Sequence, residues 1–170
     1  NIGYTIADYA VKNIKDKKVA VIYNQDPFAV LVSRAFKSKY EELGGIVLID
    51  EGYQLETQDF RTILLKAKNS GVKSIAIFGY DESGLIPKQA KEMGLGFTIL
   101  TIDTATSGLF LTNAWNAKEG IIFSSWDAAG SDYKEFEAKF VAKYGVKPQQ
   151  PLFSAAGYDT AMSIAAAMKT

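Results

Sequence analysis

The chain has 170 residues, of which 48% are hydrophobic and 22% are charged, and this composition is typical of a globular domain that can bury a substantial core. Its 19 basic and 19 acidic residues balance, so we expect no basic surface of the size that nucleic-acid binding requires. The lack of cysteine excludes disulfides and thiolate chemistry, and the lack of histidine removes the commonest general base and metal ligand. We therefore expect no catalytic residues, no metal site, no cofactor and no nucleic-acid partner.

Helix-like and strand-like patterns alternate through the first three quarters of the chain. The expected helices cover residues 3–14, 29–43, 59–69 and 83–94, with Thr57 as the N-cap of the third. The expected strands cover residues 19–23, 46–49, 74–78, 97–100 and 120–124. Strands that alternate with helices of ten or more residues indicate βαβ units. The predicted fold class is α/β, an open and mostly parallel five-stranded sheet with helices on both faces.

The uncharged strand over residues 74–78 has the pattern of a central strand that is buried on both faces. Tyr80 follows this strand, and Asp103 follows the next one, so both are expected at the carboxyl edge of the sheet, where open α/β sheets bind ligands. A carboxylate there could hold an ammonium group, and a tyrosine could add a hydrogen bond or a cation–π contact. The alternative is a solvated aspartate and a packed tyrosine.

Other residues after strand ends are less informative. Phe28 and Trp126 could wall an apolar pocket, although aromatic residues at such positions are at least as often part of the core. Asp26 and Asp81 superficially suggest an acidic metal or phospho-acceptor pocket, but aspartates are common in turns and caps. No phosphate-binding glycine motif is present.

The last part of the chain has a different character. Residues 1–126 are expected to form the α/β domain, and residues 127–170 two helices, over residues 132–144 and 154–168, with no strand between them. Their apolar stripes need a covering surface, so we expect the chain to associate with itself. The abrupt opening on a helix suggests that the sequence begins inside a longer protein.

Several strings occur in a specific order: KVAVIY (18–23), DPF (26–28), ELGG (42–45), DF (59–60), GY (79–80), KQA (88–90), GL (94–95), KEG (118–120), FVAKYG (140–145) and GYD (157–159). In this order the chain resembles the periplasmic branched-chain amino-acid-binding proteins, the type I leucine/isoleucine/valine-binding-like receptors of ABC transporters. The similarity spans nearly the whole chain. These receptors have two α/β lobes that close around a ligand. The chain resembles the second lobe, with sheet order 2-1-3-4-5, followed by helices that pack on the first lobe.

The resemblance implies a non-enzymatic solute receptor that binds an amino acid, branched-chain or similar, in a cleft between the lobes. By this resemblance Tyr80 contacts the amino-acid group of the ligand and Asp103 binds its ammonium. Phe28 lies at the cleft, where relatives often have a tyrosine, and Phe153 lines the side-chain pocket. The implied partner of the full-length protein is an ABC permease. The implied location is periplasmic or extracellular and membrane-anchored, with an export signal that this chain does not include.

Two other functions remain open from the sequence. The same fold serves as the ligand-sensing domain of regulators and receptors, and a neighbouring DNA-binding or membrane-spanning segment would distinguish that case. A flavodoxin-like enzyme domain is disfavoured, because the chain offers no histidine, cysteine or phosphate loop.

Overall fold

The computed structural model describes residues 2–125, 131–148 and 150–168. The chain divides into two compact units, Asn1–Ser125 and Trp126–Thr170, and each is described by itself. Trp126 and the predicted domain boundary after it lie outside the described residues.

The first unit is built on a parallel sheet of five strands in the order β2-β1-β3-β4-β5. The strands are β1 (Lys18–Asn24), β2 (Ile46–Tyr53), β3 (Ser74–Phe78), β4 (Thr98–Ile102) and β5 (Ile122–Ser124). All five residues of β3 are buried, as the uncharged sequence of this central strand predicts. The predicted fold class and strand order are confirmed.

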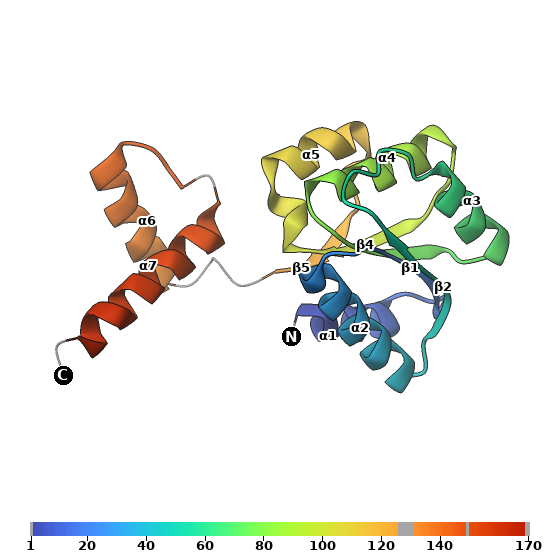
Figure 1. Cartoon of the computed structure of the whole chain (residues 1–170), viewed down its shortest axis with the longest axis horizontal. Helices are drawn as coiled ribbons and strands as arrows, with labels where there is room; N and C mark the ends of the chain where they lie inside the picture. The colour runs from blue at the N-terminus through green and yellow to red at the C-terminus, as the bar shows by residue number, and fades with distance from the viewer. Residues whose placement is uncertain (1, 126–130, 149, 169–170) are drawn as a thin grey trace. The chain divides into compact units, whose positions relative to one another are not determined.

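Helices cover both faces of this sheet (Figure 1). One face carries α1 (Ile2–Asn13) and α2 (Pro27–Glu42), and the other carries α3 (Arg61–Ser70), α4 (Leu85–Glu92) and α5 (Gly108–Ala114). Alternate residues of β1 serve the two cores, because successive side chains of a strand point to opposite faces. Val21 packs in the cluster with Phe36 of α2, while Ile22 packs in the cluster with Leu64 of α3 and Ile86 of α4.

Three local predictions were wrong. Strand β2 continues to Tyr53 instead of ending at residue 49, because β1 supplies hydrogen-bonding partners as far as Asn24. Helix α5 was not predicted. Only Phe110 and Ala114 of its seven residues are buried, so its apolar pattern is too short to indicate a helix. Thr57 does not cap α3; the Asp59 side chain instead accepts a hydrogen bond from the Arg61 backbone at 3.0 Å.

Short 3₁₀ helices follow two of the central strands and begin the loops at their carboxyl ends. These are η1 (Asp81–Gly84) after β3 and η2 (Asp103–Thr106) after β4, and a third, η3 (Trp115–Ala117), follows α5. The chain therefore turns sharply at the end of β3 and of β4, which keeps the first residues of each loop close to the sheet edge.

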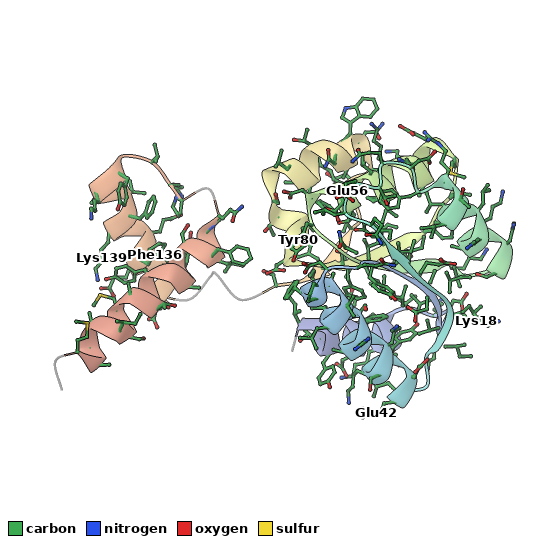
Figure 2. The ribbon with its side chains drawn as sticks, in the orientation of Figure 1. Lys18, Glu42, Glu56, Tyr80, Phe136 and Lys139 are labelled. Atoms are coloured by element: carbon green, nitrogen blue, oxygen red, sulfur yellow. The ribbon has the colours of Figure 1, made fainter. Side chains whose placement is uncertain are left out.

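The second unit contains α6 (Ser131–Tyr144) and α7 (Pro151–Ala167). Phe136, marked in Figure 2, is its buried centre, with the Tyr158 ring of α7 at a centroid distance of 5.4 Å. Helix α7 has no buried residue, and Met162 and Ile164 are 53% and 57% exposed. Within the described ranges no helix has the length and apolar character needed to cross a bilayer.

We expect the chain to self-associate through α7, because exposed apolar side chains gain free energy when a second surface covers them. Sedimentation velocity should show a sedimentation coefficient that rises with protein concentration. Met162→Glu and Ile164→Glu should weaken this rise. Leu31→Glu, a matched change at an exposed position of α2, should leave it unchanged. A monomer at every concentration would contradict the expectation.

Candidate ligand site

The candidate site lies at the carboxyl edge of the sheet, where the loops after β1, β3 and β4 meet. In the parallel pairing of β1 and β3, Tyr23 lies opposite Phe78, so the turn that begins at Asn24 runs beside the turn at Gly79. Figure 2 shows Tyr80 and Lys18, the first residue of β1, on opposite sides of the first unit. The site is therefore at the end of the strands that open α/β sheets use for ligands.

Tyr80 and Phe28 form an exposed aromatic pair at this edge. Their rings are stacked, with centroids 6.5 Å apart and an interplanar angle of 22°, and the residues are 38% and 47% exposed. The Tyr80 hydroxyl donates a hydrogen bond of 2.7 Å to Oδ1 of Asp26. The same oxygen accepts the Phe28 backbone N–H at 2.9 Å, so Asp26 is the N-cap of α2. The cap interpretation of Asp26 is correct but incomplete, because this carboxylate also orients Tyr80.

The bond to Asp26 favours the protonated form of Tyr80 beyond the ordinary preference of a phenol. This hydrogen bond, with burial and the charges of Asp26 and Glu82 as further causes, raises the pKa of Tyr80 to about 12. The phenol is therefore protonated at any physiological pH and donates to Asp26. Its oxygen lone pairs and its ring face remain available to a cationic ligand group.

Asp103 is the buried acid of the site. It is 7% exposed, at the first position of η2, and the hydroxyl of the following residue, Thr104, donates to the carbonyl of Gly79 at 3.0 Å. This bond holds the loop after β4 against the loop after β3. Burial raises the pKa of the Asp103 carboxyl, and hydrogen bonds from the backbone of Asp103 and Thr104 partly oppose that rise. Among the described residues no lysine or arginine forms a salt bridge with Asp103.

A third acid, Glu82, is bound more extensively than the sequence suggested. Its Oε1 accepts hydrogen bonds from Asn24 Nδ2 at 2.9 Å, from the Tyr53 hydroxyl at 2.8 Å and from the Tyr80 backbone N–H at 3.3 Å. Burial and the charge of Glu82 raise the pKa of Tyr53, so that phenol also remains a donor. Neither Glu82 nor Asn24 is among the candidate residues that the sequence indicates, although Asn24 is 2% exposed.

Phe153 lies on α7 in the second unit and is 54% exposed. Its place in a side-chain pocket stays a prediction, as do the ligand contacts of Tyr80, Asp103 and Phe28. The structure brings the last three together at one edge of one sheet, and it describes Phe153 in a separate unit.

A separate pocket lies at the amino ends of β4 and β5, away from the candidate site. It is lined by Ala90 and Lys91 of α4, by Leu95 and Phe97 before β4, and by Ile121 before β5. Within the described ranges no group of three or more acidic side chains is placed to hold a metal ion.

A five-stranded parallel sheet in the order 2-1-3-4-5 with helices on both faces matches the fold of type I periplasmic binding proteins. The family described as "Periplasmic binding protein" matches residues 1–170, and the chain belongs to this family.

Individual relatives agree with this assignment. The Leu/Ile/Val-binding protein homolog 2 of Brucella abortus is 29% identical over 98% of this chain and 49% of its own length. A leucine-binding protein of Thermotoga maritima matches in structure with a TM-score of 0.81 and 30% identity, over 94% of this chain and 47% of that one. A branched-chain amino acid transporter substrate-binding protein of Streptococcus pneumoniae, solved with isoleucine, gives a TM-score of 0.76 and 26% identity over 94% and 46%. The chain thus spans about half the length of these relatives.

The tight turn at Gly79 yields a stability prediction. A Cβ at this position would lie 2.1 Å from the Tyr53 hydroxyl and 3.1 Å from Glu82 Oε1, so Gly79→Ala must displace one of them. We expect a loss of about 1–3 kcal/mol in the free energy of unfolding, measured by urea denaturation. Gly96→Ala, whose added Cβ would meet nothing within 4 Å, is the matched control and should change stability by less than about 0.5 kcal/mol. Equal effects of the two substitutions would contradict the contact argument.

The pKa of Asp103 predicts a pH-dependent stability in the absence of ligand. Because the folded-state pKa is raised above the ordinary value of 3.8, the wild-type chain loses stability as the pH rises through the folded-state pKa. Asp103→Asn has no charge to desolvate, so it should be the more stable protein at neutral pH. The difference should disappear below the ordinary pKa, where the carboxyl is protonated in both states.

Urea denaturation at a series of pH values measures this difference in the free energy of unfolding between the wild type and Asp103→Asn. Asp8→Asn replaces an exposed α1 carboxylate that pairs with Lys12, and it should not reproduce the effect. A neutral-pH loss of stability in Asp103→Asn would show that the backbone hydrogen bonds to this carboxylate outweigh its desolvation.

Proposed function

We propose that this chain is one lobe of the solute-binding receptor of an ABC transporter, and that it binds an amino acid, branched-chain or similar, in a cleft between two lobes. The observation that carries the proposal is a buried carboxylate, Asp103, on a loop that Thr104 bonds to the loop of the exposed Tyr80, at the strand ends of a periplasmic-binding-protein sheet. The names of the relatives, which include leucine-, isoleucine- and valine-binding proteins, support this ligand class.

In this proposal Asp103 binds the ammonium group of the ligand. A desolvated carboxylate gains most when it acquires a cationic partner, because the partner relieves the same penalty that raises its pKa. Tyr80 adds its ring face or hydroxyl oxygen to the same ammonium group. Phe28 and Phe153 supply apolar contacts, Phe28 next to Tyr80 and Phe153 from the segment that follows the α/β unit.

The receptor is proposed to be non-catalytic, and its partner in the full-length protein is an ABC permease. An exported protein in the periplasm, or held at the outer face of a membrane, fits the family and the absence of cysteine. Since the chain spans about half the length of its relatives, the remaining contacts to the ligand are assigned to the rest of the receptor.

The proposal also excludes a class of ligand. A simple aromatic acid such as benzoate carries a carboxylate but no ammonium, so the acid at position 103 would repel it. The edge of this sheet is thus suited to amines and amino acids and unsuited to acids that lack an amine.

Isothermal titration calorimetry of the full-length receptor with L-leucine, L-isoleucine, L-valine, other amino acids and benzoate tests the proposal. We expect binding of at least one aliphatic amino acid and none of benzoate. Asp103→Asn should weaken amino-acid binding by about a hundredfold or more, since it removes one partner of a desolvated charge pair. Asp8→Asn should bind as the wild type does.

Two outcomes would contradict the proposal. Undiminished binding by Asp103→Asn would make Asp103 a structural residue of the η2 turn. No detectable binding of any amino acid in the panel would favour a ligand-sensing domain of a regulator or receptor, or a ligand of another class.

A further inference from the structure

Four residues of the candidate site are joined in a closed ring of hydrogen bonds. Asn24 Nδ2 donates to Glu82 Oε1, and Asn24 Oδ1 accepts the Asp26 backbone N–H at 2.8 Å. Asp26 Oδ1 then accepts the Tyr80 hydroxyl, and the Tyr80 backbone N–H donates to Glu82 Oε1, which closes the ring. The ring holds Tyr80 at both ends, through its backbone and through its phenol.

Glu82 connects more of this region than any other side chain in the ring. Its Oε1 receives donors from the ends of three adjacent strands, since Asn24 ends β1, Tyr53 ends β2 and Tyr80 follows β3. Two of these donors are deeply buried, with Asn24 2% and Tyr53 4% exposed. Glu82 itself is partly exposed, but removal of its carboxylate would leave these buried donors without their acceptor.

The backbone fits closely around this carboxylate. Gly79 lies against both the Tyr53 hydroxyl and Glu82 Oε1, with no room for a side chain. The Glu82 carboxylate, which accepts the Tyr80 N–H and lies against Gly79, therefore restricts the conformation of the turn from Gly79 to Glu82. The direction of the Tyr80 side chain follows from that turn.

We propose that Glu82 is a positioning residue of the ligand site: its carboxylate fixes the turn after β3 so that the Tyr80 ring reaches Asp26 and stacks on Phe28. The inference rests on the proposed function for its consequence in ligand binding, but the positioning of Tyr80 is a property of this chain alone. Glu82 acts through Tyr80 and makes no contact with the ligand. The acceptor oxygen performs this role, so glutamine can replace glutamate while alanine cannot.

The first measurement follows the Tyr80 ring in the chain itself at neutral pH. Two-dimensional ¹H–¹³C spectra of tyrosine-labelled protein are recorded, and the Tyr80 signal is assigned by its loss in Tyr80→Phe. In Glu82→Ala this signal should shift to the position of a freely exposed tyrosine, whereas in Glu82→Gln it should stay close to the wild-type position. Glu56→Ala, at an exposed residue marked in Figure 2, is the matched control and should shift nothing.

A second variant keeps the test decisive if Glu82→Ala does not fold. Tyr53→Phe deletes one of the three donors and keeps the ring that packs edge-on against Phe60 at 4.9 Å. It should move the Tyr80 signal in the same direction by a smaller amount. An unchanged Tyr80 signal in folded Glu82→Ala, or in Tyr53→Phe where Glu82→Ala is unfolded, would overturn the inference.

The second measurement is a double-mutant cycle on L-leucine affinity in the full-length receptor. Glu82→Ala should weaken binding about tenfold when Tyr80 is present and leave it unchanged in the Tyr80→Ala background, which has no ring to position, because coupled residues are not additive. An equal loss in both backgrounds would show that Glu82 acts by general destabilisation, and it would overturn the inference. If the wild-type receptor does not bind leucine while the Tyr80 signal still shifts, the positioning role stands and leucine is not the ligand.

Discussion

The burial of β3 on both faces is the constraint on which the rest of this structure depends. A strand with five buried residues needs an apolar layer above it and another below, and the alternation of helices along the chain supplies both. The same burial disfavours charged side chains within the strand, whose one polar residue is Ser74, so charged side chains begin only after its end. The turn from Gly79 to Glu82 consequently carries at the sheet edge the charged groups that the strand itself lacks.

The three charged side chains described at that edge are all acidic. Asp26, Glu82 and Asp103 lie on neighbouring loops of a chain whose total formal charge is zero. Their environments differ, however. Within the described part of the chain, Glu82 accepts from three protein donors and Asp26 from two, while Asp103 accepts from its local backbone and has a pKa raised by burial. This difference separates a carboxylate that holds the structure together from one that gains by meeting a cation.

The sequence predicted the architecture well because its strongest signals were local and repeated along the chain: apolar strand segments that alternate with helices of regular length. Tyr80 and Asp103 could be predicted as candidate residues at the sheet edge, because position after a strand determines position at that edge. Glu82 and Asn24 could not, because their importance lies in a bond between residues 58 positions apart. The length of β2 and the existence of α5 were missed for a related reason, since tertiary pairing and a short one-sided contact define them.

The asymmetry of the edge bears on the function that we propose. An amino acid carries an ammonium and a carboxylate, and the acids at this edge can attract only the first of these groups. In the proposed receptor, donors from another part of the protein would meet the ligand carboxylate, and the relatives are about twice the length of this chain. Such a division has a physical advantage: neither half alone satisfies the ligand, so binding energy becomes available only when the two halves close around it. The ring through Glu82 fits this arrangement, because it holds Tyr80 in place before closure and so reduces the conformational entropy that binding would otherwise lose.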